Sequence, residues 1–559
     1  MARRPLIACV AFLLLFSSSW GWAVEPKLVV AILVDQLRYD YLERFAGQFS
    51  DGGFLRLGGQ GAFLTSAYYD YLPTVTAPGH ATFLSGAPPS VHGIIGNDWW
   101  DKATGKSMYC CADPDVEGVG TKGPGGRMSP RNFVGSNFAD EFRLRFRGRV
   151  VGVSMKDRGA ILPAGKKPAG AYWFESGSGA FVTSTYYRAE LPGWVEGFNA
   201  RGLAAGYIGK TWSRLLKPEA YLWEDAAAGE GALKGEEAPV FDHVIHPSTK
   251  EGFESIMPTP FGNELLLEFA KAAVEGEKLG QGAVPDLLCV SFSSLDYCGH
   301  RFGPYSQEVQ DLTLRLDRQI GELLRFLDGK VGAGKYVVVL TADHGVAPNP
   351  EFAAAQGMDG RRVDMLELTA SLKGRLSEHF GPGDYVLGKR LSEELHFNHE
   401  LLREKKVAAG ELAAFIREWA LGTGVYQAAY SREQLLEGRA PGRLGELVVN
   451  GYNAERGADM VLLFKPYMLP GMPVVEGVAP SGTTHGSGYA YDTHVPVFFY
   501  GPGFKAGRVT AGARVTDIVP TLSAVLRMDV PPGCVGRVLS EVLAPAAEVP
   551  KPASKKAAR

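Results

Sequence analysis

The sequence predicts an α/β fold with a layered core and a mostly parallel central sheet. Apolar, β-branched runs of strand length occur at 27–34, 149–155, 287–292, 336–341 and 495–500. Continuous runs of this kind are typical of strands buried on both faces. Segments with helical periodicity lie between them, at 263–275 and 306–327, and the second repeats apolar residues at Val309, Leu312, Leu316 and Ile320. Such alternation indicates a layered α/β core.

Composition excludes a disordered chain, a collagen-like fibre and a coiled coil. The chain has 559 residues, of which 45% are hydrophobic and 21% charged, which is ordinary globular usage. Its length predicts two to four domain-sized units, or one large domain with insertions. The formal charge of -3 lacks the basic surplus of a dedicated nucleic-acid binder. Nothing in the sequence fixes an oligomeric state.

The first 23 residues have the layout of a secretory signal peptide. Arg3 and Arg4 precede an apolar run at 6–16, and small residues follow up to Ala23. We expect cleavage after Ala23 and a mature protein in the periplasm or outside the cell; an uncleaved anchor is the alternative. The apolar run is too short to span a bilayer, and no other run is long enough, so we expect no stable membrane anchor.

Five cysteines remain after the signal peptide, at positions 110, 111, 289, 298 and 534. An odd number leaves at least one thiol free, or none paired, and the sequence does not decide the pairing.

The chain divides into a core and two long insertions. We expect the catalytic core to comprise 24–160, 281–345 and 481–544. Residues 161–280 and 346–480 are rich in Gly, Ala and aromatic residues, and we interpret them as insertions that cap one face of the sheet. Residues 545–559 are rich in Ala, Pro and Lys and predict a disordered tail.

Charged and imidazole side chains follow four of the predicted strands. They are Asp35, Lys156, Asp296 and the adjacent pair Asp343 and His344. Ligands of open α/β sheets bind beyond the carboxyl ends of the strands, so these side chains mark a predicted site. One such Asp alone would be read as a helix cap.

Three carboxylates and three imidazoles form a candidate metal-ligand set. Asp296 and His300 lie four residues apart, Asp343 and His344 are adjacent, and the set is completed by Asp35 and His485. Mixed Asp and His ligands suit Zn²⁺ and, less selectively, other divalent transition metals. Six ligands divide into two sites of three. The histidine pairs His243/His246 and His396/His399 lack matching carboxylates at strand ends, and we interpret them as surface or structural residues.

Thr76 is the candidate nucleophile. Pro78 follows it closely, which is typical of a helix start, where backbone N–H groups point at an anion. Taken alone, Thr76 would be a plain helix cap. Beside a predicted dimetal site, its hydroxyl becomes a nucleophile, because a bound metal lowers its pKa.

The order of these motifs resembles the alkaline phosphatase superfamily. Within it the chain is similar to the type I phosphodiesterase/nucleotide pyrophosphatase branch and to the PafA-like alkaline phosphatases that use a threonine nucleophile. The resemblance covers most of 27–540. Its motifs are Val-Asp-Gln-Leu-Arg-Tyr-Asp at 34–40, Pro-Thr-Val-Thr-Ala-Pro-Gly-His at 73–80, Gly-Asn-Asp at 96–98, Lys-Asp-Arg at 156–158, Asp296 with His300, Thr-Ala-Asp-His-Gly at 341–345 and Thr-His-Gly at 484–486.

The resemblance implies roles for these residues and an alkaline-phosphatase-like α/β sandwich fold, with helices on both faces of the central sheet. One zinc would be held by Asp296, His300 and His485, and the other by Asp35, Asp343 and His344, with the Thr76 oxygen as a further ligand. Thr76 would attack phosphorus and form a phosphothreonine that is then hydrolysed. The phosphoryl oxygens would be bound by Asn97, Lys156 and Arg158. Two zinc ions per subunit are therefore expected.

Lys156 and Arg158 favour phosphate monoesters as substrates. If they end a strand, alternation places both on one face, where two cations favour a doubly charged monoester over a singly charged diester. The resemblance points the same way, because diesterase relatives typically lack the pair. A phosphodiesterase or nucleotide pyrophosphatase is the alternative enzyme, and a phosphate or metal binder without chemistry is the alternative outside enzymes.

Overall fold

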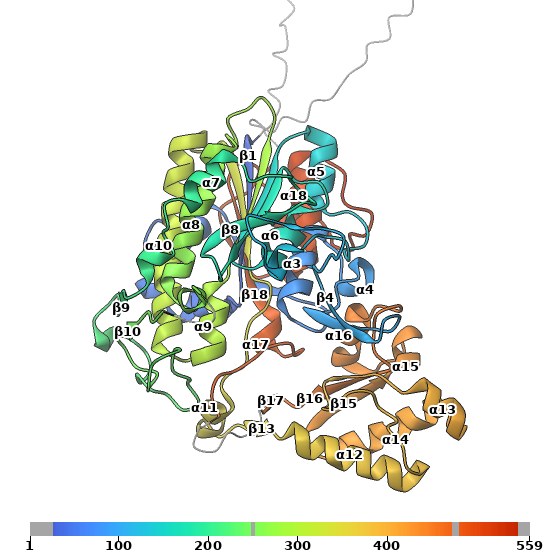
Figure 1. Ribbon diagram of the computed structural model, residues 1–559. Helices are drawn as coiled ribbons and strands as arrows, with labels where there is room; N and C mark the ends of the chain where they lie inside the picture. The colour runs from blue at the N-terminus through green and yellow to red at the C-terminus, as the bar shows by residue number, and fades with distance from the viewer. Residues whose placement is uncertain (1–25, 248–251, 472–479, 546–559) are drawn as a thin grey trace, which may run out of the picture.

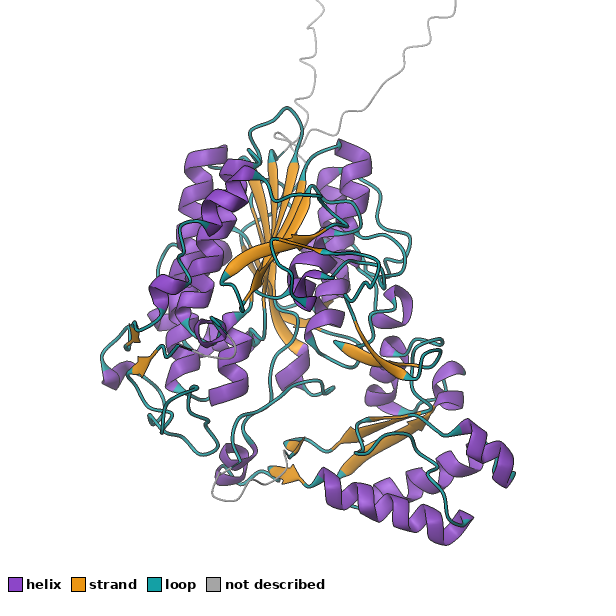
Figure 2. Ribbon diagram, viewed as in Figure 1, coloured by secondary structure: helices purple, strands orange, loops and turns teal. Residues whose placement is uncertain are grey.

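The computed structural model describes residues 26–247, 252–471 and 480–545, and it is built on an 11-stranded sheet (Figures 1 and 2). The strand order is β19 (Gly507–Val509), β2 (Ala62–Tyr68), β18 (His494–Tyr500), β12 (Tyr336–Thr341), β1 (Leu28–Val34), β11 (Asp286–Phe292), β6 (Val150–Ser154), β7 (Gly170–Glu175), β8 (Ala180–Ser184) and β5 (Gly118–Val119), with β20 (Ala513–Arg514) beside β2. The predicted α/β class is confirmed.

The central strands are parallel, and their carboxyl ends therefore meet at one edge. β1 lies between β11 and β12, with Ile32 opposite Val290 and Leu340. All residues of β1 are buried, which explains why the strand reads as an unbroken apolar run. β18 runs antiparallel to both of its neighbours, β12 and β2.

Helices cover both faces of the sheet (Figure 1). One face carries α8 (Pro260–Gly276) and α10 (Gln307–Leu327), and the other carries α3 (Thr76–Ser85), α5 (Phe138–Phe146), α6 (Asp157–Ala164) and α18 (Ile518–Leu526). The predicted periodicity of α10 is confirmed, since Val309, Leu312 and Leu316 are fully buried. Its first turn is capped by the Ser306 side chain, which accepts a hydrogen bond from the Val309 N–H.

Shorter elements complete the described chain around the sheet. They are α1 (Tyr39–Arg44), α2 (Phe54–Gln60), α4 (Pro89–His92), α7 (Gly193–Asn199), α9 (Ser294–Phe302), α11 (Pro350–Ala355), α17 (Ala490–Thr493), β3 (Asp98–Asp101), β4 (Lys106–Tyr109), β9 (Thr211–Trp212) and β10 (His243–Val244).

Described residues 361–470, here called the insertion unit, have a hydrophobic core of their own. Their elements are β13 (Arg361–Val363), α12 (Met365–Phe380), β14 (Glu394–Leu395), α13 (His399–Lys405), α14 (Ala409–Gly422), β15 (Tyr426–Ser431), α15 (Arg432–Leu436), α16 (Gly442–Gly451), β16 (Met460–Phe464) and β17 (Met468–Pro470). The unit docks on the core where the Leu72 N–H donates to the Leu447 carbonyl at 3.0 Å. Gly451 permits this approach, because a Cβ there would lie 1.5 Å from the Leu72 oxygen.

The interpretation of 161–280 as a capping insertion is wrong in part. β7 and β8 within this range extend the central sheet, and α8 packs against β6 and β11. The reason is local composition: β7 reads Gly-Ala-Tyr-Trp-Phe-Glu, and its aromatic residues replace the β-branched run that marks the other parallel strands.

Two predictions concern the ends of the chain. The signal peptide at 1–23 lies outside the described residues, as does the predicted tail at 545–559 apart from residue 545. Among the described residues, no helix is both long and apolar enough to cross a membrane. The five described cysteines are all free thiols, so no disulfide joins any two of them.

Candidate metal centre and active site

The predicted ligands converge at the carboxyl ends of three adjacent strands. Asp35 follows β1, and Asp343 and His344 follow β12. β11 leads into α9, which carries Asp296 and His300 four residues apart and so on one side of the helix. Parallel pairing of these strands therefore brings together residues that are distant in sequence.

The first ligand group comprises Asp35, Asp343 and His344, and all three are fully buried. His344 Nε2 lies 3.5 Å from Asp35 Oδ1 and 3.5 Å from Asp343 Oδ2. Burial and the neighbouring Asp35 raise the pKa of Asp343 well above its usual range. Two carboxylates this close and this buried need a positive charge between them.

The second ligand group comprises Asp296, His300 and His485. Asp296 Oδ1 lies 3.2 Å from His300 Nε2 and 3.5 Å from His485 Nε2. Burial alone would raise the pKa of Asp296, but Lys156 and His300 outweigh it and hold that pKa well below its usual range. This carboxylate is therefore ionised, as a metal ligand must be.

All three histidines are oriented in the same way. Each places Nδ1 beside a backbone carbonyl: His300 at 2.9 Å from Thr483, His344 at 2.9 Å from Gly345, and His485 at 2.8 Å from Thr74. Nδ1 must carry the proton to donate to these carbonyls, which leaves a lone pair on Nε2. Nε2 is the atom that faces the carboxylates in both groups, as in histidines that bind metals.

Unpartnered buried atoms show that the residues fit a metal. Asp35 Oδ1, Asp343 Oδ2 and His344 Nε2 have no hydrogen-bond partner. Leaving such atoms buried and unsatisfied costs about 1–3 kcal/mol each, and more for charged groups. Acceptor-only atoms that face a common point are satisfied by a cation, so the two groups suit a divalent metal centre.

Lys156 joins the two ligand groups. Its Nζ lies 2.5 Å from Asp35 Oδ2 and 2.6 Å from Asp296 Oδ2. Burial would lower the Lys156 pKa, but these two carboxylates raise it above its usual range. The predicted strand geometry is wrong here: β6 ends at Ser154, and Lys156 is the N-cap of α6. Helix entry, and not strand alternation, therefore places Lys156 and Arg158.

Arg158 lies in the first turn of α6 and is held by Tyr109. Arg158 Nη1 donates to the Tyr109 hydroxyl at 3.2 Å, and that hydroxyl donates to Asp157 Oδ1 at 2.5 Å. Arg158 Nε is buried and has no hydrogen-bond partner. An unsatisfied guanidinium N–H next to Lys156 is suited to an anionic ligand.

Thr76 is the first residue of α3, as predicted, and it is 1% exposed. Its carbonyl accepts from His80 Nδ1 at 2.8 Å, and the same nitrogen lies 3.2 Å from Asp343 Oδ2. Two residues earlier, the Thr74 carbonyl holds His485. The start of α3 is thus tied to both ligand groups. The Ala77 N–H donates to Asn97 Oδ1 at 2.9 Å. Asn97, a predicted phosphoryl-binding residue, therefore lies beside the start of α3.

Sequence reasoning missed two side chains of the site, Gln36 and Tyr109. Gln36 Nε2 donates to Asp296 Oδ1 at 2.7 Å, while its backbone N–H donates to Asp343 Oδ1 at 3.0 Å, so it contacts both groups. Its φ of 67° is unusual for a residue other than glycine. Tyr109 had no predicted role, whereas the contact of His80 with Asp343 agrees with the expectation that His80 packs beside the ligands or contacts them without being a ligand itself. Gln36 could have been noticed, because it follows Asp35 directly.

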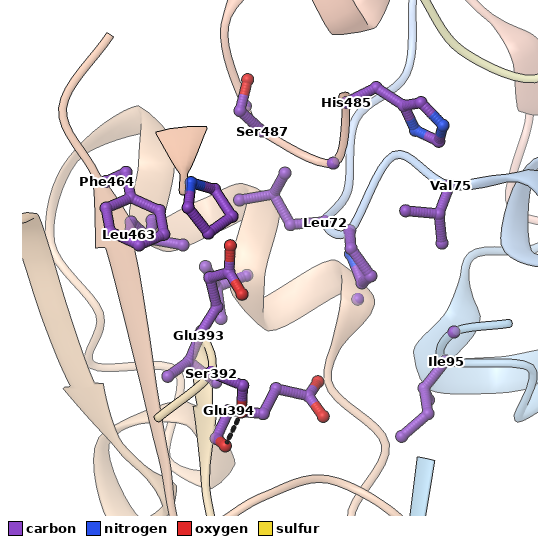
Figure 3. A pocket seen from close by; sticks show the side chains of 18 of the residues that line it. Leu72, Val75, Ile95, Ser392, Glu393, Glu394, Leu463, Phe464, His485 and Ser487 are labelled. Carbon is purple, nitrogen blue, oxygen red and sulfur yellow. Dashed lines mark hydrogen bonds between the residues drawn. The ribbon is translucent and has the colours of Figure 1, made fainter. Parts of the chain in front are cut away.

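A cavity of about 680 Å³ adjoins the site (Figure 3). From the core it is lined by Val75, Asn97 and His485, and from the insertion unit by residues such as Glu393 and Phe464. Since Val75 immediately precedes Thr76, the cavity opens next to the candidate nucleophile.

Comparisons with known proteins show the family of the chain. The model of the family "Type I phosphodiesterase / nucleotide pyrophosphatase" matches residues 29–457. The chain is 38% identical to alkaline phosphatase PafA of Elizabethkingia meningoseptica, over 93% of this chain and 95% of that protein. It is 35% identical to alkaline phosphatase PhoV of Synechococcus elongatus, over 93% of each. A Myroides odoratus protein named a calcium-transporting ATPase is 39% identical, over 93% of this chain and 95% of that one.

A solved structure shares the whole architecture. The crystal structure of wild-type alkaline phosphatase PafA superimposes with a TM-score of 0.85 at 38% identity, over 93% of this chain and 99% of that one. The chain therefore belongs to the type I phosphodiesterase/nucleotide pyrophosphatase family and, within it, is a relative of the alkaline phosphatases PafA and PhoV.

Proposed function

We propose that this protein is an exported, metal-dependent phosphomonoesterase, an alkaline phosphatase that hydrolyses small phosphate monoesters through a phosphothreonine. The names of PafA and PhoV support this activity. The observation that carries the proposal is the position of α3, whose first residues are tied to both ligand groups through Thr74 and His80.

We propose that each ligand group holds one Zn²⁺, with other divalent transition metals as substitutes. Asp296, His300 and His485 hold one ion, and Asp35, Asp343 and His344 hold the other, with the Thr76 oxygen as a further ligand. When bound, such a pair lowers the pKa of a hydroxyl and offsets the charge that develops on the attacking and leaving oxygens.

Thr76 supplies the nucleophile. Its hydroxyl oxygen bonds to phosphorus, and the alcohol departs with the electron pair of the broken P–O bond and takes up a proton. Water then attacks the phosphothreonine, which releases inorganic phosphate and restores the hydroxyl. The burial of Thr76 keeps bulk water from competing in the first step.

Asn97, Lys156 and Arg158 bind the non-bridging phosphoryl oxygens. Phosphoryl transfer spreads charge over these oxygens, so the protein chiefly supplies position and positive potential. The buried, unpartnered Nε of Arg158 is a free donor, and Tyr109 holds the guanidinium in place. Two cations at this point favour the dianion of a monoester.

The remaining proposals concern location and organisation. Residues 1–23 act as a signal peptide that sends the enzyme to the periplasm or outside the cell. The insertion unit caps the site on the side of the cavity, and the core, with β7, β8 and α8 included, carries the catalytic residues.

The test compares hydrolysis of an aryl phosphate monoester with hydrolysis of the matching diester by the purified holoprotein. We expect the monoester to be preferred over the diester by at least about a hundredfold. Chelation of the metal should abolish hydrolysis of the monoester, and Zn²⁺ should restore it. A preference for the diester would support the phosphodiesterase alternative, which agrees with the name of the family model. Activity that is indifferent to the chelator would overturn the proposed metal dependence.

A further inference from the structure

The cavity beside the site lies between the core and the insertion unit. Figure 3 shows Val75, Ile95 and His485 on one side, with Glu393 and Glu394 opposite them. A substrate whose phosphoryl group reached the start of α3 would direct its organic part into this space. A volume of about 680 Å³ holds a substituted aromatic ring.

Most of the cavity wall is apolar or aromatic. The core contributes Leu72, Val75, Ile95 and Trp100, and the insertion unit contributes Tyr452, Leu463, Phe464 and Met468. Burial of apolar area against such walls stabilises a bound ring by about 25 cal/mol per Å². Walls of this kind favour an apolar alcohol as the leaving group of the ester and do not contribute to phosphate binding.

The far side of the cavity is acidic. The Glu393 carboxylate is attracted by Arg390 and by its own backbone N–H, and the Glu394 carboxylate by Lys102, but among the described residues neither carboxylate is held in a close ion pair. Burial and the adjacent Glu393 raise the pKa of Glu394 to about 7. Asp492 also lines the cavity but lies on the side of His485, where its Oδ2 accepts from the Ser487 N–H at 2.8 Å.

Two basic residues line the cavity as well. The Arg390 guanidinium donates to the Gly471 carbonyl, which fixes its direction, and Lys465 comes from the loop after β16. The carboxylates of Glu393 and Glu394 lie on the side of the cavity opposite His485, as Figure 3 shows. A positively charged group placed there would add a closer charge pairing to the attraction that Glu393 has to Arg390 and Glu394 to Lys102.

We propose that this cavity is the leaving-group subsite and that it selects phosphate monoesters of apolar, aromatic alcohols that carry an ammonium group at the end away from the phosphate. The proposal rests on the proposed phosphomonoesterase function. It adds a class of substrate: a molecule with a dianionic phosphoryl group at one end, a ring in the middle and a cation at the other. Anionic leaving groups are disfavoured by the same carboxylates.

The test uses three esters with the same reacting bond and different distal charge. They are the phosphate monoesters of tyramine, para-ethylphenol and para-hydroxyphenylpropionic acid, which carry a cation, no charge and an anion. We expect kcat/KM to fall in that order by about tenfold at each step, equivalent to about 1.4 kcal/mol. In the Glu393→Gln/Glu394→Gln variant the ratios of the charged esters to the neutral ester should approach one.

Glu400→Gln, which removes an exposed carboxylate of α13 outside the cavity lining, is the matched control and should keep the ratios. Equal kcat/KM for the three esters, or ratios that survive in the double variant, would overturn the subsite.

A direct measurement separates this result from the activity itself. Binding of phenethylammonium, which lacks phosphate, is followed by NMR on the holoprotein and on the double variant. Binding that is weakened in the double variant supports the subsite even if no ester is hydrolysed, in which case only the proposed function fails. Binding that is absent, or equal in the two proteins, overturns the subsite whatever the esterase activity.

Discussion

The imidazole rings of His344 and His485 stack with their centroids 3.5 Å apart. His344 belongs to the ligand group of Asp35, and His485 belongs to that of Asp296. Burial and the neighbouring His485 hold the pKa of His344 well below its usual range. A neutral imidazole is the form that binds a metal. In the proposed dimetal centre the stacked rings would form the shared wall of the two cation sites, so loss of either ring should affect both.

Replacement of His485 by Ala should remove metal from the Asp296 group and lower phosphatase activity by at least about a hundredfold, because a ligand and the shared wall are lost. Elemental analysis of the purified protein should show about one metal ion fewer per chain. His399→Ala is the control, since this exposed histidine pairs with Asp459 and belongs to neither ligand group. An unchanged metal content in the His485 variant would contradict the assignment of this ligand.

Thr76→Ala should lower turnover by at least about a thousandfold, because the nucleophilic hydroxyl at the start of α3 is lost. Thr76→Ser keeps the hydroxyl and should retain measurable activity. Mass spectrometry of the acid-quenched enzyme, taken during turnover, should find phosphate on the peptide that contains residue 76 in the wild type and in the serine variant. Phosphate on another residue would refute the role of Thr76.

Substitution of Lys156 and Arg158 should separate monoesters from diesters. With both changed to Ala, we expect kcat/KM for an aryl monoester to fall by about a hundredfold or more, because two positive charges are lost from the phosphoryl site. For the matching diester the fall should be below about tenfold, since it carries one charge fewer. Equal losses for the two substrates would show that the pair serves the metal groups alone, through the contacts of Lys156 with Asp35 and Asp296.

The sequence predicted the strands whose residues are buried on both faces, because burial leaves an unbroken apolar run. β1, β11 and β12 are of this kind, and the ligands that follow them were predicted with them. β7 and β8 lie toward one edge of the sheet; β7 carries aromatic residues and a glycine, and β8 is a short Ala-Phe-Val-Thr-Ser segment, so neither has the unbroken β-branched run that marked the core strands. The cavity also escaped prediction, since it depends on how the insertion unit docks through Leu72.

Side-chain contacts between distant segments were equally out of reach. Asp35 and Asp343 could be identified by residue type and position after a strand. The link from Gln36 to Asp296, or from Tyr109 to Arg158, depends on packing that no local pattern encodes. The placement of Lys156 shows the same limit, since a strand that ends two residues earlier changes the geometry.

The hydrogen bond from Gln36 to Asp296 should increase the metal affinity of the Asp296 group. Gln36→Gly removes the side chain and tolerates the left-handed φ of 67°, so the backbone N–H to Asp343 is kept. We expect metal affinity at the Asp296 group to fall by about 10–100-fold, as for other outer partners of metal ligands. Competition with a chelator measures it.

Gly299→Ala gives an independent test of the same contact. A Cβ at position 299 would lie 1.8 Å from Gln36 Oε1, so the Gln36 side chain must move. The alanine variant should therefore reproduce the loss of metal affinity seen for Gln36→Gly. If Gly299→Ala binds metal normally, the link from Gln36 to Asp296 has no bearing on the site.

Glu230 should make the fold less stable at alkaline pH. Burial and the neighbouring Glu308 raise the pKa of Glu230 to about 9, and neither of its carboxylate oxygens has a hydrogen-bond partner. In the unfolded chain a glutamate has a pKa of about 4.3, so between these values the folded protein holds one proton more. Stability is therefore full below about pH 4.3 and falls as pH rises toward 9.

Glu230→Gln removes this titration and keeps the shape of the side chain. Because the penalty of the wild type grows with pH above the unfolded pKa, by at most about 1.4 kcal/mol per pH unit, the variant should gain clearly more stability at about pH 8 than at about pH 5. Thermal unfolding of the metal-loaded proteins at the two pH values measures the difference. Glu237→Gln is the control, because that glutamate is exposed and should show no pH-dependent gain. A gain of equal size at both pH values would instead mean that Glu230 destabilises the fold through packing, without a change in its protonation.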